Sequence, residues 1–488
     1  MRRMLTLLTA LALLCAPGAL GEAALPEPEA VTGEMILGEA EAEYFYEATL
    51  YYVGTDGLSL SQATRTLLVR AGATLPETAL EALFDSSGSL AQAAVAPADT
   101  RLVSCELSGG VATVDLSIEA RNVQSEQELL LMYLAIAGTL TAIDGIDGVN
   151  VLINGRQESV LGVPCGILDS GREDVMAAWA QAQAEAERYA GSAEGQVTRT
   201  AAVYYPAAGG EWLVPEAREI TFAQEDCVDA LLSALCAQPE DSACVVPLAS
   251  EGALTAGEPS LNVTGAGERV LELNLSEDVF SRAVAAGVEP WQVCGALTVT
   301  MCSFVPELDA VRLSVGGTPL TEVERDGQTL SFADGLMRRR DFSGFVGSPA
   351  RIFLADEGGA LVTRDLALSR GAALSPRALL EAVLSEETAA ALGACAPVSG
   401  GLDGTDVLGV RVEDGVAVAN LSSRFYGACQ ALDEAGERTA VYAVVNTLCE
   451  LPGVDAVQFL IEGESVETLA GTIYLRTVLL PNPGAVTG

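Results

Sequence analysis

The chain has 488 residues, half of them hydrophobic, which is enough for about three domains with cores of normal size. Asp and Glu number 67 against 26 basic residues, all of them arginine, and the net charge of −41 argues against binding to nucleic acid or docking of folded domains on anionic lipid. The absence of histidine excludes Ser-His-Asp and Cys-His catalysis and every histidine-ligated metal site.

Residues 1–21 have the pattern of an export signal. Arg2 and Arg3 form a positive start, and the apolar run 5–14 is too short to span a bilayer. Ala19-Leu20-Gly21 is a small-x-small cleavage pattern, whereas Cys15 offers lipid modification as an alternative, although Leu14 before it departs from the small residue usual there. We expect an exported protein, either cleaved after Gly21 or anchored through Cys15.

The stretch that follows the leader, residues 22–42, is rich in Glu, Ala and Pro and predicts an acidic tether. No later segment reaches about 18 uninterrupted apolar residues, so no transmembrane helix is predicted.

Four features then recur three times in the same order, which indicates an internal repeat. The first is an apolar strand at 48–52, 201–205 and 350–354. The second is a strand that carries Arg65, Arg218 or Arg364, followed by a helix at 77–84, 226–237 and 376–384. The third is a strand at 111–117, 270–276 and 416–422. The fourth is a helix that ends in a turn and a last strand, within 136–155, 296–317 and 444–463.

The third feature shows how one unit folds. Ala112, Val114 and Leu116 alternate with polar residues and face one way, as in a half-buried strand. Its last serine, Ser117, Ser276 or Ser422, can cap the helix that follows. With the single apolar helix stripe Val441, Val444, Val445 and Leu448, the pattern predicts an α+β fold of three tandem small domains, each a short mixed sheet with two helices on one face.

Connections of different composition separate the units. Residues 170–173 form a capping box that opens an Ala-rich helix, and Asp326-Gly327 is a turn signal. The predicted organisation is a signal peptide at 1–21, the tether at 22–42, domain 1 at 43–167, a helical linker at 168–198, domain 2 at 199–323, a linker at 324–347, domain 3 at 348–478 and a C-terminal tail at 479–488.

The third unit resembles a known family. Its segments 351–356, 414–422 and 444–463 are similar to the opening strand, the central strand and the end of a GerMN domain, and the likeness covers most of 347–477. Units 1 and 2 resemble it more weakly, through 110–117 and 149–155 and through 270–276 and 308–317. The resemblance implies a fold similar to the ring-building motif, an envelope protein of spore-forming bacteria, commonly a lipoprotein, and no catalytic residues.

The repeated polar positions are the candidate sites. Arg65, Arg218 and Arg364 suit a shared partner contact, an internal ion pair or a strand-edge charge. Asp115, Asn274 and Asn420, on the strand face opposite the core, suit a metal or carbohydrate site or a turn residue bonded to its own backbone.

Two further features are weighed in the same way. The basic run Arg338-Arg339-Arg340 suits an acidic partner or a lipid headgroup, and more simply a solvated linker. Asp403 and Asp406, in a Gly-rich loop, are the best local carboxylate pair, and the chain has no EF-hand or P-loop pattern. The ten cysteines after the leader include no CxxC pair and read as small buried hydrophobes, with disulfides left open.

Together with these observations, the resemblance implies a non-enzymatic scaffold of the cell envelope, at the outer face of the cytoplasmic membrane or secreted, that acts in sporulation or germination without a cofactor. Its expected partners are other envelope or sporulation proteins, ring-forming channel components among them, with membrane contact only through an N-terminal lipid. The alternatives are an envelope protein that binds a peptidoglycan fragment or a divalent cation, and a wall hydrolase that uses Asp and Glu alone.

Overall fold

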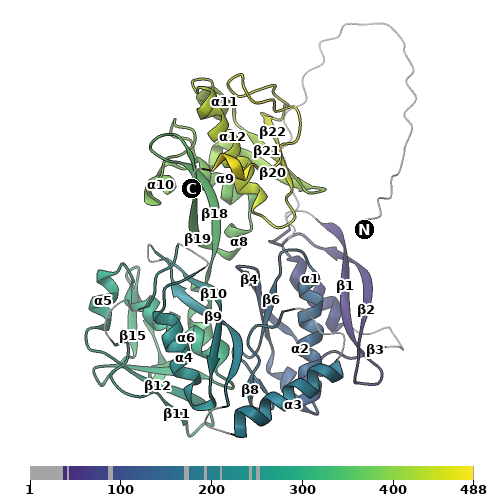
Figure 1. The fold of residues 1–488 in the computed structure, drawn as a ribbon, viewed down its shortest axis with the longest axis vertical. Coiled ribbons are helices and arrows are strands. Elements are labelled where there is room, and N and C mark those ends of the chain that lie inside the picture. Colours follow the sequence, from purple (N-terminus) through teal and green to yellow (C-terminus); the bar gives the residue numbers. More distant parts are fainter. Residues whose placement is uncertain are drawn as a thin grey trace.

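The computed structural model describes residues 37–40, 43–85, 92–169, 175–191, 195–208, 211–240, 244–248 and 253–486. Three large clusters of buried hydrophobic side chains organise this part of the chain, and Figure 1 shows the corresponding three lobes, with the third placed above the other two. A search of the described helices finds none that is long and apolar enough to cross a membrane.

Unit 1 begins with the antiparallel hairpin of β1 (Tyr44–Gly54) and β2 (Leu60–Val69), with the short β3 (Gln92–Ala93) on the other edge of β1. Helix α1 (Leu75–Phe84) follows. A three-stranded sheet pairs β4 (Leu102–Ser108) antiparallel with β5 (Val111–Leu116), and β5 parallel with β6 (Gly148–Ile153). The parallel crossover contains η1 (Ile118–Arg121) and the long helix α2 (Glu126–Thr141), and the hairpin of β7 (Ser159–Val160) and β8 (Val163–Pro164) ends the unit.

Unit 2 repeats this order. The hairpin of β9 (Val197–Pro206) and β10 (Leu213–Phe222) leads to η2 (Gln224–Asp226) and α4 (Cys227–Cys236). Strand β11 (Ser260–Val263) pairs antiparallel with β12 (Arg269–Leu275), and β12 pairs parallel with β13 (Ala310–Val315). Helices α5 (Val279–Ala285) and α6 (Pro290–Phe304) form the crossover, and β14 (Thr318–Pro319) pairs with the end of β13.

Unit 3 has the same plan with two extra short helices. The hairpin of β18 (Gly347–Ala355) and β19 (Leu361–Ser369) is followed by α8 (Arg370–Ala373), α9 (Pro376–Leu384) and α10 (Glu386–Ala391). After η5 (Gly404–Asp406), β20 (Val407–Glu413) pairs antiparallel with β21 (Val416–Leu421), and β21 pairs parallel with β22 (Ala456–Ile461). The crossover holds α11 (Ser423–Cys429) and α12 (Glu434–Cys449), and η6 (Pro483–Ala485) lies near the end.

The long helix of each unit lies between two sheets. Helices α2, α6 and α12 each contact the opening hairpin and the last strand of the mixed sheet, and every residue of α6 from Trp291 to Phe304 is buried. A helix buried on all sides carries apolar residues all round, so the single stripe predicted for α12 is too narrow. The predicted α+β class with a mixed sheet is confirmed, with the opening hairpin as a second sheet.

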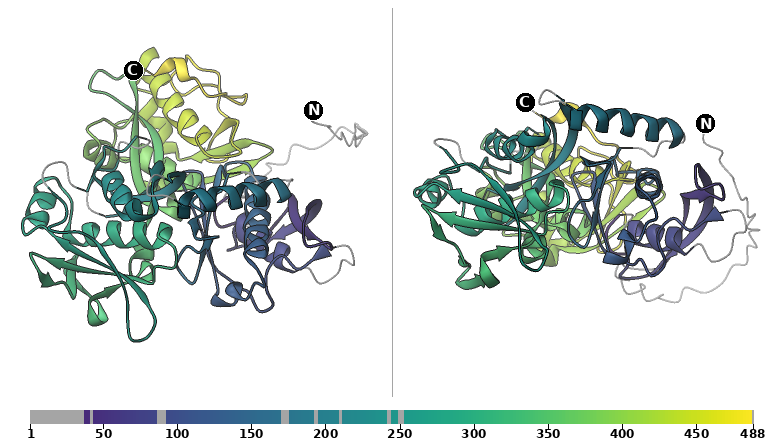
Figure 2. Two further views of the ribbon diagram at one scale, coloured as in Figure 1. Left: turned by 60° about the horizontal axis from the view of Figure 1, so that its bottom comes forward. Right: turned by 90° about the horizontal axis from the view of Figure 1, so that it is seen from below.

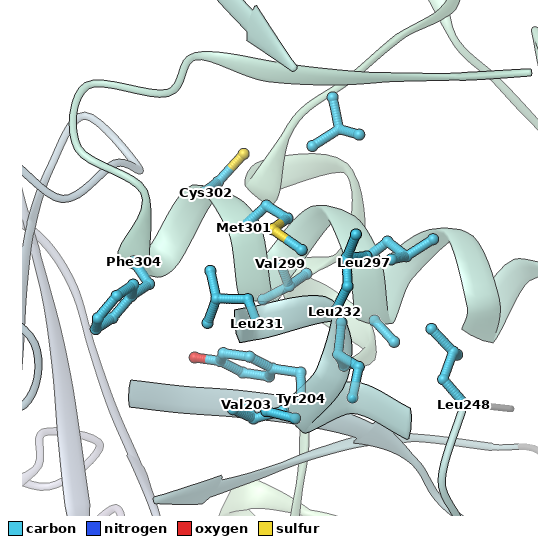
Figure 3. Close-up of a cluster of buried hydrophobic side chains, with 14 of the residues drawn as sticks. Val203, Tyr204, Leu231, Leu232, Leu248, Leu297, Val299, Met301, Cys302 and Phe304 are labelled. Atoms are coloured by element: carbon cyan, nitrogen blue, oxygen red, sulfur yellow. The ribbon is translucent and has the colours of Figure 1, made fainter. Parts of the chain in front are cut away.

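The core of unit 2 illustrates this packing. In Figure 3, Val203 and Tyr204 of the hairpin lie below Leu231 and Leu232 of α4, and the side chains of α6 close the cluster from above. All these side chains are less than one-tenth exposed. Burial of each large apolar side chain contributes about 1.5–3 kcal/mol, so this shared core is the main stabilising element of the unit.

Local signals set the helix ends. Thr74 and Glu77 form a capping box at the start of α1, in which each side chain satisfies a free backbone N–H of the other. At α9, Ser375 caps the helix and Pro376 occupies its first turn, where a missing N–H is harmless. The helix predicted at 376–384 is therefore found at those residues.

The two connections are themselves folded. Helix α3 (Val175–Gly191) runs along the outside of the molecule beside units 1 and 2, most clearly in Figure 2; the predicted capping box at 170–173 lies outside the described residues. The second connection forms the hairpin of β15 (Glu322–Arg325) and β16 (Gln328–Ser331), with both Asp326 and Gly327 at positive φ in its turn. After η3 (Ala333–Gly335), β17 (Leu336–Met337) pairs with β13, and α7 (Arg339–Phe342) and η4 (Ser343–Phe345) lead into unit 3.

Candidate functional site

The three arginines that recur in the second strand each bind the end of a helix in their own unit. The guanidinium donates to a backbone carbonyl in the last turn or just beyond it: Arg65 to Ala82 at 3.2 Å, Arg218 to Gln238 at 3.0 Å and Arg364 to Leu392 at 3.0 Å. A cation there satisfies unpaired carbonyls and opposes the negative end of the helix dipole. The arginines thus hold the opening hairpin against α1 in unit 1, α4 in unit 2 and α10 in unit 3.

Asp115, Asn274 and Asn420 fix a turn. The side-chain oxygen accepts from a glycine N–H at 2.8 Å in each unit: Asp115 from Gly155, Asn274 from Gly317 and Asn420 from Gly463. Each glycine is the second of two successive residues with positive φ, a conformation that glycine adopts without steric cost. The bond therefore reaches the turn after the neighbouring parallel strand, whereas the sequence suggested a bond within the residue's own turn.

Asp115 is the one residue of these three that can carry a charge, and its carboxylate is buried. Asp115 is 9% exposed, and burial raises the pKa of its carboxyl, an effect that the hydrogen bond from Gly155 partly offsets. Asn274 and Asn420 make the same contact without a charge. The contact therefore needs an oxygen acceptor and no negative charge.

The predicted serine cap is found in one unit. Ser422 accepts from the N–H of Phe425 at 3.1 Å and caps α11. Ser117 instead accepts from the N–H of Arg101, outside the helix, and Ser276 donates to the carbonyl of Ala253. These two predictions are wrong because the segment after the strand begins its helix differently: η1 has no side-chain cap and α5 starts only after Asp278.

A repeated threonine on the long helix completes the internal framework. The hydroxyl oxygen accepts from a backbone N–H of the opening strand: Thr139 from Tyr51 at 3.0 Å, Thr300 from Tyr204 at 2.9 Å and Thr447 from Phe353 at 2.9 Å. An unpaired buried N–H would be costly, so these threonines join the hairpin to the helix. In the sequence, the available signal was a threonine at the equivalent position of the three long helices.

The junction of the three units is a buried cluster of charges. Glu106 of β4 pairs with Arg339 of α7 at 2.9 Å and with Arg370 of α8 at 2.5 Å, and Arg339 also reaches the hydroxyl of Ser303 on α6. Glu106 and Arg339 are 9% and 4% exposed. Burial alone would raise the pKa of Glu106, but the two arginines outweigh burial and hold it below its ordinary value.

This cluster corrects the prediction of a solvated linker at the basic run. Arg340 is 78% exposed, as predicted, but Arg339 is buried, and Arg338 pairs with Glu268 at 2.6 Å. The run serves contacts within the chain, because burial of a guanidinium requires a carboxylate partner of good geometry.

A second contact joins units 1 and 2. Gln157 is fully buried. Its backbone N–H donates to the backbone carbonyl of Cys302 at 3.3 Å, and its backbone carbonyl accepts from the N–H of Glu307 at 2.7 Å. Beside it, Arg156 pairs with Asp309. The turn after β6 is therefore built into unit 2.

A pocket lies between units 1 and 2 and is walled by α3. Its volume is about 530 Å³, within the usual range for small-molecule sites. Apolar side chains line the floor, namely Leu130, Leu134, Val160, Val163, Ile167 and Leu168, and the helix contributes the small Ala178 and Ala182. Asp147, Asp169, Gln181 and the ion pair of Glu185 with Arg199 at 2.5 Å complete the lining.

The acidic loop of unit 3 is used structurally. Asp406 is 2% exposed and accepts from Ser422 at 2.6 Å and Arg424 at 3.1 Å, and Asp403 accepts from the N–H of Thr405 at 2.8 Å. In the part of the chain that the structure describes, no group of three Asp, Glu or Cys side chains is placed to hold a metal ion. Cys15 lies outside that part, and the ten cysteines within it form no disulfide.

Two segments match one protein family. Residues 49–159 and 352–467 match Germane, a family described as sporulation and spore germination; they lie in units 1 and 3. A search of curated proteins finds no match.

Three solved structures are similar to parts of the chain. The first is the tandem GerMN domains of the sporulation protein GerM from Bacillus subtilis. The match is 15% identical in sequence and covers 60% of this chain and 100% of the GerM structure, with a TM-score of 0.25. The first GerMN domain of the same protein is 22% identical over 27% of this chain and 96% of that chain, with a TM-score of 0.23. A candidate lipoprotein from Clostridium perfringens is 22% identical over 27% of this chain and 86% of that chain, with a TM-score of 0.17.

Proposed function

Because residues 49–159 and 352–467 belong to the Germane family of sporulation and spore germination, we propose that the protein is a non-enzymatic scaffold of the cell envelope in one of these processes. It would bind other envelope or sporulation proteins, ring-forming channel components among them, from the outer face of the cytoplasmic membrane or after secretion. Cys15 would supply a lipid anchor if it is modified.

The observation that carries the proposal is the joining of the three units into one body. Glu106, Arg339 and Arg370 come from three different parts of the chain and meet in one buried cluster, and Gln157 is built into the neighbouring unit. Such contacts fix the distance and angle between the outer surfaces of the units. A scaffold needs this property, because it presents several binding surfaces in a constant arrangement.

The engagement of the repeated polar residues supports a role without catalysis. The arginines bind helix ends, the Asp and Asn residues bind turns, Asp403 binds its own loop, and Asp406 binds Ser422 after β21. General acid–base work needs a carboxyl whose proton can be exchanged with a substrate, and these groups are already bound within the fold.

A localisation experiment tests this proposal. The chain would be fused at its C-terminus to a fluorescent protein and followed in a sporulating host, beside a Cys15→Ala copy. We expect enrichment at the forespore membrane, and a spore assembly or germination defect when the gene is deleted. Uniform release to the medium together with normal spores would refute a role in sporulation. Loss of enrichment in Cys15→Ala would assign the anchor to that residue.

The pocket between units 1 and 2 favours a second candidate function, binding of a peptidoglycan fragment. A floor of apolar side chains with polar groups at the edge suits a ligand that combines peptide and sugar. The cation alternative has no candidate cluster among the described residues.

A ligand that binds only the folded state raises the melting temperature by mass action. The assay adds purified muropeptides to the protein, with Ala182→Trp to fill the pocket and Ala184→Trp, on the exposed side of α3, as the control. A rise in melting temperature that disappears only in Ala182→Trp would support this second function, and the absence of any rise would remove it.

A further inference from the structure

The outer strand of the mixed sheet is covered in units 1 and 3 and open in unit 2. The outer strands are β4, β20 and β11, and in each of them one core-facing residue pairs with the equivalent residue of the central strand. These pairs are Leu107 with Ala112, Val412 with Ala417 and Leu261 with Leu271. Leu107 and Val412 are 8% and 5% exposed, whereas Leu261 is 42% exposed. Val263, on the same face two residues later, is 71% exposed.

The cause is the position of the helix after the opening hairpin. Helix α1 packs on β4 and α9 packs on β20, whereas α4 packs mainly on β9, β10 and α6. The β11–β12 hairpin also extends further toward its turn, because its pairing continues to Val263 opposite Arg269, whereas the counterparts turn at Gly109-Gly110 and Asp414-Gly415. Strand β11 therefore lies at the outer end of the lobe (Figure 1).

The free edge of β11 has the chemistry of a strand acceptor. Among the described strands β11 pairs only with β12, and all four of its residues, Ser260 to Val263, are exposed and uncharged. Soluble proteins normally protect such an edge with charges, proline or a covering element. At β4 of unit 1 a covering element is present, since β18 of unit 3 lies against it and Ser108 donates to the carbonyl of Gly347 at 3.2 Å.

We propose that β11 is a docking strand that takes an extended segment of a partner protein as an additional strand of the unit 2 sheet. This inference rests on the proposed scaffold function and names the kind of partner. Backbone hydrogen bonds along the open edge would provide affinity, and apolar side chains at alternate positions of the segment would cover Leu261 and Val263.

Charge selects a basic partner over a second copy of this chain. Glu258, just before β11, is exposed, whereas the nearby Glu268 and Glu272 pair with Arg338 and Arg312. A chain with a net charge of −41 repels its own copies. The expected segment therefore carries lysine or arginine at its end, next to the alternating apolar residues.

The test uses a fluorescent synthetic peptide with valine at alternate positions, threonine between them and lysine at both ends. A second peptide has glutamate in place of lysine. Anisotropy titration with the full mature chain is expected to show saturable binding of the lysine peptide and weaker binding of the glutamate peptide. Hydrogen exchange is expected to slow at residues 260–263 when the lysine peptide is bound.

Two matched valine-to-lysine substitutions, one on β11 and one on the equivalent strand β4, provide the decisive comparison. Val263→Lys places a charge where the partner's apolar side chain would lie and should weaken binding about tenfold or more. Val103→Lys is the matched control, because Val103 is an exposed valine (60%) on the equivalent strand of unit 1, and it should bind like the wild type. Equal loss in both variants, or no saturable binding of either peptide, would overturn the proposal.

Two further outcomes separate this inference from the scaffold function. A dimer in sedimentation that Val263→Lys abolishes would assign the edge to a second copy and overturn the partner assignment. In the sporulating host, a Val263→Lys protein with normal localisation and normal spores would refute docking at β11 but leave the scaffold intact. A gene deletion without a spore defect would refute the scaffold itself.

Discussion

Asp115 and Asn420 occupy the same position of two units and differ only in charge, so they allow a reciprocal test of the turn contact. Burial raises the pKa of Asp115, so the folded chain binds its proton more readily than the unfolded chain. The charged form therefore lowers stability above that pKa. We expect Asp115→Asn to raise the free energy of unfolding at pH 7 by about 1 kcal/mol, the size of many single-residue effects, with the gain fading as the pH falls through the pKa of Asp115.

The reverse change in unit 3 is the control. Asn420 is 1% exposed, so Asn420→Asp would bury a charge and should cost about 1–3 kcal/mol at pH 7, and less in acid. Urea unfolding of both variants at pH 7 and in mild acid measures the two effects. A loss of stability in Asp115→Asn would show that the charge itself is needed.

Glu437 holds the end of unit 3. Its carboxylate is fully buried and accepts from the N–H groups of Leu469, Ala470 and Thr472 at 2.7–2.9 Å. Burial alone would raise the pKa of Glu437, but these donors hold it below the ordinary value. Its stabilisation is present above the unfolded pKa of about 4.3 and is lost as the pH falls through the folded pKa.

Glu437→Gln should therefore cost about 1–3 kcal/mol at neutral pH, because an amide N–H₂ would face a backbone donor. We expect hydrogen exchange to accelerate at residues 469–475 and not in α3. An unchanged exchange rate at these residues would contradict the role assigned to Glu437.

At the scale of elements, Thr300 and Thr298 on α6 give a matched pair. Both are fully buried, but the hydroxyl of Thr300 accepts from the N–H of Tyr204, whereas that of Thr298 finds no partner among the described residues. Thr300→Val should cost about 1–3 kcal/mol by leaving that N–H unsatisfied, and Thr298→Val should be neutral or stabilising. Equal effects in thermal unfolding would show that the hydroxyl does not join the hairpin to the helix.

Elements were predictable where the signal is local. The start of α9 follows from Ser375 and Pro376, and its predicted end is also observed. The alternation of Ala112, Val114 and Leu116 placed β5. The second sheet was not predicted, because strand alternation shows which residues are buried and does not show which side of a helix the strand covers.

At the scale of the whole molecule, the contacts between units were not predictable. Glu106 and Arg339 are 233 residues apart, and a run of three arginines in an acidic chain has the same local pattern whether it is solvated or buried. Candidate sites were predictable as repeated positions, but their hydrogen-bond partners lie on other elements, as with Asp115 and Gly155. Repetition identifies residues that each unit needs and leaves their structural or binding role open.

The buried cluster of Glu106, Arg339 and Arg370 allows a test of whether the three units form one rigid body. Glu106→Gln would leave Arg339 charged and buried without its carboxylate, which should cost about 3–5 kcal/mol. Because the two arginines hold the pKa of Glu106 below its ordinary value, the wild type should lose this contribution on acidification through that folded pKa, and the variant should show a smaller dependence on pH.

Calorimetry should then show one cooperative transition for the wild type and a separate, earlier transition of unit 3 in Glu106→Gln. Arg339→Met added to Glu106→Gln should recover much of the lost stability, because it removes the buried unpaired charge. Arg340→Met, at a side chain that is 78% exposed, should change stability by less than about 0.5 kcal/mol. A single, unshifted transition in Glu106→Gln would mean that other contacts unite the units, and separate transitions already in the wild type would contradict the rigid arrangement on which the scaffold proposal depends.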